Sequence, residues 1–382
     1  MEESILVKNA DLLYSGEIIK NSFVLIKNGK IKSINDKVDK YDKIIDARGL
    51  KMFPGIIDIH NDTIEYMITP RRRTLFLNPN SINEMIMNFL SSGVTCFYFT
   101  LTVSSEPGIR SVEYCKKSID LIKSLVKNSI LEDNVKIHLR YELTLNLEKY
   151  IEDFIDFSNI DMFCINDHSP DGITQWSKEK FIRNLKSRCD ICTDDENEII
   201  SNINEYKKHS LDNLKNVINQ IKNLNIPIGI HDLSDINQVS DLGIKKFDFA
   251  EFPKNREVIM TLKNMNLPII LGAPNVVLGG SQFGNISAEY AAKEGLCDIL
   301  CSDFKASSLI LAAYRLAELY NGDLGKTWNL VSSNPASIFK IKQKGDLIQG
   351  KDADFILVDD YSGIPKVMET YIKGQQVYKS VI

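Results

Sequence analysis

The chain has 382 residues, 43% of them hydrophobic, so it is long enough to bury a large core in one to three domains. Its net charge is −5, with both signs spread along the sequence, which excludes a general electrostatic attraction to nucleic acid or to anionic membranes. The N-terminus lacks the basic start and apolar core of a signal peptide, and no apolar run approaches the roughly 20 residues that span a bilayer. We therefore expect a cytoplasmic protein without a nucleic-acid or membrane partner.

Both ends of the chain carry short β-strand signals. They cover residues 5–14, 23–36 and 43–53 at the start and 345–360 and 366–380 at the end. Asn28-Gly29, between two such runs, is a strong hairpin signal. We predict that residues 1–53 and 344–382 form a small β-sandwich domain together, with residues 54–343 inserted as a second domain.

The inserted region repeats strand and helix signals. Helical spacing of apolar residues is clear at 81–93 and 114–128. Between the helical stretches lie eight short apolar runs, at 56–60, 94–100, 135–142, 160–168, 226–232, 247–253, 267–274 and 297–303. Runs that are apolar throughout are typical of a parallel sheet covered by helices, and the length predicts a (β/α)₈ TIM-type barrel. A doubly wound sheet is the alternative, but no glycine-rich phosphate loop follows the first strand.

Histidines and carboxylates gather where these runs end. The ends carry His60, Asp62, Glu142, Asp167, His168, His231, Asp232 and Asp303. Because the carboxyl ends of barrel strands meet at one face, these side chains should lie together. His60 and Asp62 alternate with Asn61 and so point the same way. Nitrogen and oxygen donors of this kind predict a site for Zn²⁺, Mn²⁺ or a similar divalent ion.

Each of these residues could instead cap a loop or helix, which is the commoner role for any one of them. The metal site is favoured because the chain has only five histidines and three of them end predicted strands. His209 lies in a charged helical stretch and is expected at the surface. His138 lies inside a strand, on the same face as Glu142, and could be a barrel-interior residue, a substrate contact or a ligand.

The seven cysteines indicate thiols rather than disulfides. Their number is odd, and four of them lie in apolar runs: Cys96, Cys164, Cys297 and Cys301. Cys189 and Cys192 form a single CxxC, which a metal or redox pair would share. Without a second CxxC, we interpret this pair as part of a turn before a helix.

The segment PGIIDIHND at 54–62 resembles the first-strand signature of the amidohydrolase superfamily, and NPA at 334–336 followed by KGDLIQGKDADFILVD resembles its return into the small domain. One branch, the diphosphatases of phosphonate degradation, is similar over nearly the whole chain. The motifs that carry this likeness are PGIIDIHNDTIEYMITPR, HLRYELT, INDHSPDGITQW, APNVVLGGSQFGNISA and CSDFKASSLI.

The resemblance implies two divalent metal ions, Zn²⁺ or Mn²⁺, held by His60, Asp62, His168, His231 and Asp303. Glu142 would bridge them, and Asp303 would also accept a proton from water. Ligands of the superfamily stand on the first, fourth, fifth, sixth and eighth strands, whereas those counted here stand on the first, third, fourth, fifth and eighth. We therefore expect that the count omits one strand early and splits one late.

The branch releases pyrophosphate from α-D-ribose 1-methylphosphonate 5-triphosphate, so the resemblance implies an anionic small-molecule substrate. Candidate substrate contacts are His138, Arg71 with its neighbours Arg72 and Arg73, Asn275, Ser281 and Lys305. The sequence departs from the branch pattern near Thr174, at Leu233 and at Gln282, in loops that would hold the substrate. Two alternatives stay open: an amidohydrolase that cleaves a C–N bond of a cyclic amide or deaminates a base, and a binding protein on the same scaffold. Barrels of this type often dimerise, so a homodimer is also considered.

Overall fold

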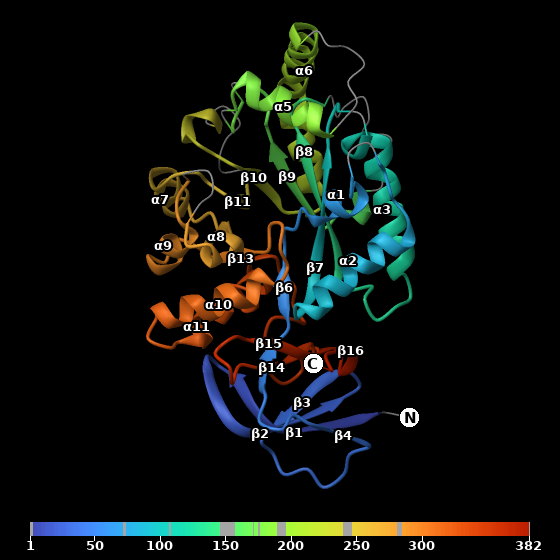
Figure 1. Ribbon diagram of the computed structural model, residues 1–382, viewed down its shortest axis with the longest axis vertical. Helices are drawn as coiled ribbons and strands as arrows, with labels where there is room; N and C mark the ends of the chain where they lie inside the picture. The colour runs from blue at the N-terminus through green and yellow to red at the C-terminus, as the bar shows by residue number, and fades with distance from the viewer. Residues whose placement is uncertain are drawn as a thin grey trace.

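The computed structural model describes residues 3–71, 74–106, 108–145, 157–170, 172–174, 176–188, 196–239, 247–280 and 285–381. These residues form two eight-stranded sheets, and Figure 1 shows them one above the other along the long axis of the molecule. Within the described ranges no helix is both long and apolar enough to cross a membrane.

Both termini build the lower sheet, as predicted (Figure 1). Its strands follow the order β16-β15-β14-β5-β1-β2-β3, and β4 pairs with β1. Their bounds are β1 Ser4–Tyr14, β2 Glu17–Lys27, β3 Lys30–Ile34, β4 Lys43–Asp46, β5 Lys51–Pro54, β14 Phe355–Asp359, β15 Lys366–Ile372 and β16 Gln375–Lys379. The predicted hairpin at Asn28-Gly29 is confirmed: both residues have positive φ, 52° and 75°, as a tight turn between β2 and β3 requires. The bounds of the two domains stay a prediction.

The upper sheet contains eight strands, and every pair of neighbours in it is parallel. They are β6 Ile56–Asp58, β7 Val94–Val103, β8 Val135–Glu142, β9 Met162–Asn166, β10 Ile228–His231, β11 Phe249–Glu251, β12 Ile269–Gly272 and β13 Ile299–Cys301. Each apolar run identified in the sequence coincides with one strand, in the same order, although β7 continues beyond its run to Val103. The barrel prediction is therefore confirmed, and the expectation that one strand had been omitted and another split is wrong.

The barrel closes between its first and last strands, at the end where the candidate ligands lie. An isolated parallel bridge joins Asn61 to Asp303. The Asp62 amide donates to the Asp303 carbonyl at 2.6 Å, and the Asp303 amide donates to the His60 carbonyl at 3.1 Å. The seam between β6 and β13 is thus closed by the backbone of the candidate site itself.

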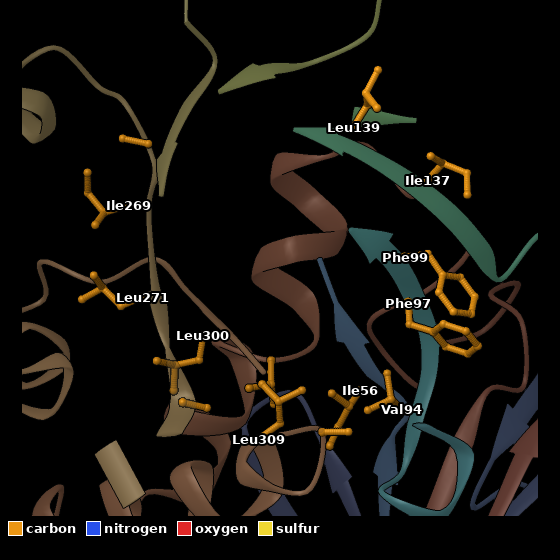
Figure 2. Packing of buried hydrophobic residues seen from close by; sticks show 14 of the residues in the cluster. Ile56, Val94, Phe97, Phe99, Ile137, Leu139, Ile269, Leu271, Leu300 and Leu309 are labelled. Carbon is orange, nitrogen blue, oxygen red and sulfur yellow. The ribbon is translucent and has the colours of Figure 1, made fainter. Parts of the chain in front are cut away.

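Alternate residues of each barrel strand face different environments. On β8, Ile137 and Leu139 pack in the large outer cluster with apolar side chains of the helices, and Figure 2 shows them beside the phenyl rings of β7. His138, Arg140 and Glu142 alternate with them and are buried. The period of the strand therefore directs three polar side chains into the barrel.

Helices surround the barrel strands (Figure 1). They are α1 Thr63–Ile68, α2 Pro79–Ser91, α3 Val112–Val126, α5 Lys178–Arg188, α6 Glu196–Asn223, α7 Arg256–Asn264, α8 Ala273–Val277, α9 Ala288–Lys293, α10 Ser308–Leu319, α11 Leu324–Asn329 and α12 Ser333–Ile338. The helices predicted at 81–93 and 114–128 correspond to α2 and α3. Asn78 starts α2 with a reciprocal capping box to Ser81, which satisfies backbone donors at the helix N-terminus.

The four cysteines predicted as buried thiols are buried and not disulfide-bonded, which confirms that interpretation. Burial raises the pKa of the Cys96 thiol to about 12, so it stays protonated at neutral pH. Cys189 and Cys192 lie outside the described residues.

A buried network of charged residues joins the barrel to the small sheet. The Lys344 Nζ atom donates to Asp354 at 2.6 Å, to Asp352 at 3.3 Å and to the Asn134 amide oxygen at 3.1 Å. Asn134 in turn donates to the Thr95 carbonyl at 2.7 Å and to Asp354 at 3.0 Å. We refer to Asn134, Lys344, Asp352 and Asp354 as the junction network.

Candidate metal centre

Three predicted ligands come together at the barrel seam: His60, Asp62 and Asp303. One donor atom from each lies within 4.8 Å of the others. His60 is fully buried, and its Nε2 atom has no hydrogen-bond partner, with the nearest carboxylate oxygen, of Asp62, at 3.5 Å. An orphaned buried nitrogen facing two carboxylates is the arrangement that a divalent cation satisfies. We call these three residues the seam group.

The backbone takes left-handed turns where three strands end at this face. Asp232, Phe252 and Asp303 have φ values of +56°, +50° and +57°. Asp tolerates this conformation, whereas an aromatic residue adopts it only when its surroundings fix it. The Phe252 ring packs edge-on against the rings of His60 and His231, at 5.1 and 5.2 Å between centroids. The Phe252 ring therefore packs against both imidazoles and restricts their positions.

Glu251, at the end of β11, holds the same two imidazoles from below. Its Oε2 atom lies 3.0 Å from His60 Nδ1 and 3.1 Å from His231 Nδ1. The two rings are nearly parallel, at 14° and 5.6 Å. Because Glu251 engages both Nδ1 atoms, both Nε2 atoms face the opposite way, as metal-binding histidines require of their second nitrogen. Glu251 was not among the predicted ligands, although an acidic residue near the end of the apolar run FDFAEFP was the available signal.

The charges of the seam group are strongly perturbed. Burial lowers the pKa of the His60 imidazole, but Glu251 and Asp62 outweigh it and raise that pKa to about 10. Burial, together with the charge of Asp62, raises the pKa of the Asp303 carboxyl to about 6. Without a cation the centre thus holds a proton on His60, and metal binding would replace that proton.

Arg140, on β8, also reaches the candidate metal centre. Its Nη1 atom donates to both oxygens of Asp62 at 2.9 Å, and its Nη2 atom donates to His231 Nε2 at 3.1 Å. Burial would raise the pKa of the Asp62 carboxyl, but Arg140 and His60 hold it well below its usual range. Arg140 was not among the predicted site residues either, although it alternates with His138 and Glu142 along the strand.

Glu142 and His168 are paired with each other. His168 Nδ1 lies 2.5 Å from Glu142 Oε1, and the His168 amide donates to Oε2 at 3.2 Å. The outer side of the His168 ring contacts Trp176, at 4.7 Å between centroids. Glu142 belongs to none of the ligand groups found among the described residues, and its role as a bridge between two metal ions stays a prediction.

Four groups of the described residues have donor atoms close enough to share an ion. Besides the seam group they are His168 with His231 and Asp232, His60 with His138 and Glu251, and Cys164 with His231 and Glu251. The last two lie inside the barrel and share the Glu251 carboxylate that already binds two imidazoles. The seam group fits a divalent ion, since its donors converge and one of them is orphaned. The group around His168 contains His231, whose Nε2 atom Arg140 already occupies.

The candidate substrate contacts are scattered. His138 is fully buried, with Nδ1 3.1 Å from the Ile59 carbonyl and its ring 5.2 Å from that of His60, which fits the barrel-interior interpretation rather than substrate contact. The Asn275 oxygen accepts from the Ala288 amide at 2.8 Å and so links α8 to α9. Lys305 and Arg71 are exposed. Ser281, Gln282, Arg72 and Arg73 lie outside the described residues, as does the His209 side chain.

Asp167, which the sequence placed at a strand end, organises the loop after β9 instead. Its carboxylate accepts from the amides of Ser169 at 3.2 Å and Ile173 at 3.1 Å, and it forms an ion pair with Lys207 of α6 at 2.9 Å. Gly172 lies against it so closely that any Cβ atom would fall 2.4 Å from Oδ1. Asp167 therefore has the capping role that we weighed against ligation.

Comparisons with known proteins agree with this architecture. No family model matches the chain. The curated α-D-ribose 1-methylphosphonate 5-triphosphate diphosphatase of Escherichia coli (strain K12) is 24% identical over 389 aligned positions, covering 98% of this chain and 100% of that protein. A 5-methylthioadenosine/S-adenosylhomocysteine deaminase of Halothermothrix orenii is 27% identical, but over only 28% of this chain and 33% of its own length.

Among solved structures, a β-aspartyl dipeptidase of Fervidobacterium islandicum superimposes with a TM-score of 0.61 at 19% identity, covering 98% of this chain and 97% of that one. At this level of identity the likeness concerns the fold. The expected resemblance is confirmed: the chain has the fold of the amidohydrolase superfamily and is similar along nearly its whole length to a ribose 1-methylphosphonate 5-triphosphate diphosphatase.

Proposed function

We propose that this protein is a metal-dependent hydrolase that releases pyrophosphate from α-D-ribose 1-methylphosphonate 5-triphosphate. The observation that carries the proposal is the similarity to a curated diphosphatase across 98% of this chain and all of that protein. The deaminase match is confined to 28% of the chain, so it supports the C–N alternative more weakly. The converging donors of the seam group support the hydrolytic part of the proposal.

In this proposal the seam group holds a divalent ion, which lowers the pKa of a water molecule and stabilises negative charge on phosphate oxygens. Asp303 accepts the proton of the attacking water, because its carboxylate lies in the seam group beside the position of the ion. The water oxygen bonds to the α-phosphorus of the triphosphate as the bridging P–O bond between the α- and β-phosphorus breaks, which leaves ribose 1-methylphosphonate 5-phosphate and pyrophosphate.

The substrate's remaining phosphate charge would meet lysines around the same face. Lys305 lies two residues after Asp303 and is exposed. Lys254 follows β11 and donates to the Thr174 carbonyl in the loop after β9. Burial lowers the pKa of the Lys254 ammonium, with Asp232 nearby acting in the opposite direction. Both lysines border the strand ends and are proposed as phosphate contacts.

The alternative is an amidohydrolase that cleaves a C–N bond. It is favoured by the local deaminase match and by the fold shared with a dipeptidase, since both names describe C–N hydrolysis. The two proposals share the metal and Asp303 and differ in the bond that breaks.

A substrate panel separates them. The protein loaded with Zn²⁺ or Mn²⁺ is assayed with the ribose phosphonate triphosphate, nucleoside triphosphates, hydantoins and dihydroorotate, and both pyrophosphate and ammonia are measured. We expect pyrophosphate from the ribose triphosphate, with ¹⁸O from labelled water in the 5-phosphate product. Turnover of a cyclic amide or release of ammonia, with no pyrophosphate from any triphosphate, would contradict the diphosphatase proposal and leave the C–N alternative.

A further inference from the structure

The guanidinium group of Arg140 lies between two side chains that the resemblance assigns to metal ions. It bridges Asp62, on the first barrel strand's end, and His231, at the end of β10. Only 4% of the Arg140 side chain is exposed. A buried cation in contact with two expected metal ligands bears directly on the number of metal ions that the centre can hold.

Both ring nitrogens of His231 are already engaged. Arginine has only N–H donors, so His231 Nε2 must accept the hydrogen bond from Arg140 at 3.1 Å. His231 Nδ1 then carries the ring proton and donates to Glu251 at 3.1 Å. Neither nitrogen has a lone pair left for an ion while Arg140 stays in place.

All three guanidinium nitrogens of Arg140 have acceptors. Nη1 serves the two oxygens of Asp62, and Nη2 serves His231. The side-chain oxygen of Asn166, oriented toward Arg140, accepts from Nε at 2.7 Å and from Nη2 at 3.2 Å. Displacing this guanidinium would leave a permanent charge buried without its partners, which is strongly unfavourable.

The seam group is different, because the Nε2 atom of His60 has no hydrogen-bond partner. We infer that the centre binds one divalent ion, at His60, Asp62 and Asp303, and that Arg140 takes the place of the second ion that the resemblance implied. One guanidinium and one metal ion then share Asp62, and His231 orients Arg140 instead of binding metal. This inference rests on the proposed metal site but not on the identity of the substrate.

Metal counting tests the inference. The full-length protein is stripped with a chelator, reloaded with excess Zn²⁺, passed through a desalting column and analysed by mass spectrometry for zinc per chain. We expect one equivalent for the wild type and one for Arg140→Lys, which keeps the charge. Arg140→Met removes the charge and the donors at similar length, and we expect its count to rise to two, with His168 and His231 providing the second site.

Two equivalents in the wild type, or one in a folded Arg140→Met variant, would overturn the inference and leave the proposed hydrolase intact. If Arg140→Met does not fold, anomalous scattering from wild-type crystals loaded with Zn²⁺ decides the matter: a single peak beside His60 Nε2 supports the inference, and a peak on His231 overturns it. A wild-type protein without zinc would contradict both this inference and the proposed function.

Discussion

Two regions of the molecule bury charged side chains, and they differ in how completely those side chains are hydrogen-bonded. At the junction network, Lys344, Asp352, Asp354 and Asn134 all bind one another or the backbone. At the opposite end of the strands, three of the four buried side-chain atoms without a hydrogen-bond partner in the described residues belong to His60, His138 and Glu251. A satisfied network fixes a structure, whereas orphaned polar atoms that the fold tolerates mark a place where a ligand belongs.

The junction network and the candidate metal centre therefore differ in what a substitution should change. The junction network attaches the small sheet to the base of the barrel, so its loss should change stability. The seam group gathers metal donors around a proton on His60 that a cation would replace, and burial makes the Asp303 charge unfavourable, so loss of Asp303 should change chemistry and leave stability unharmed. Substitutions in the junction network should therefore lower stability and spare activity, whereas substitution of Asp303 should lower activity and spare stability.

The largest effect on chemistry is expected from Asp303→Asn. Removing the proposed proton acceptor should reduce kcat by about 10²–10⁴-fold. Stability should be unchanged or higher, because burial and Asp62 make the Asp303 charge unfavourable in the fold. Turnover and thermal unfolding of the purified variant measure both effects. Asp39→Asn, an exposed carboxylate in the small domain, is the control and should match the wild type; full activity of Asp303→Asn would remove the proposed role.

The junction should give the reverse result. Lys344→Ala leaves Asp354 buried without its counter-charge, although Asp352 keeps its ion pair with Lys30, and the loss costs about 3–5 kcal/mol of unfolding free energy. Urea denaturation measures the loss, and kcat per folded molecule should equal that of the wild type. A variant that keeps its stability but loses activity would show that the two ends are not separable in this way.

Glu251→Gln should lower the metal affinity of the candidate metal centre. A carboxylate oxygen that accepts from two Nδ1 atoms orients His60 and His231, and such supporting residues are worth about 10–100-fold in metal affinity. Competition with a chromophoric chelator measures the Zn²⁺ affinity. The same change at the exposed Glu257 of α7 should have no effect. Unchanged affinity in Glu251→Gln would mean that the ring positions do not depend on this carboxylate.

The smallest effect is expected at the rim. Lys305 is exposed, so a contact with phosphate is weakened by solvent, and Lys305→Ala should raise KM for the triphosphate roughly two- to fivefold with little change in kcat. Steady-state kinetics at low ionic strength measure this shift, and the exposed Lys293→Ala serves as the control. A KM equal to that of the wild type would remove Lys305 from the phosphate contacts.

The sequence predicted the architecture well because periodicity is a local property. Eight apolar runs became eight barrel strands, and Asn28-Gly29 became a hairpin because two consecutive positive φ values suit those residues. The strand ends also pointed correctly to His60, Asp62 and Asp303 as neighbours, since the carboxyl ends of all the strands share one face.

The interior of the site could not be predicted in the same way. Attention to strand ends overlooked Arg140 and Glu251, and the alternation that places Arg140 between His138 and Glu142 would have shown that it points inward. The ion pair that each charged side chain forms depends on which strands lie near one another in the barrel. Glu142 pairs with His168, and Asp62 with Arg140, through contacts between strands that the spacing along the chain does not specify.

The seam between β6 and β13 has a consequence for the order of events during synthesis. Asn61 and Ser302 are hydrogen-bonded to each other across 241 positions of the chain. A nascent chain contains His60 and Asp62 early, but it lacks Asp303 until the last barrel strand has left the ribosome. Contacts of such long range form late in folding. Barrel fragments ending before β13 would therefore be unable to assemble the seam group, so competence for catalysis would coincide with completion of the barrel.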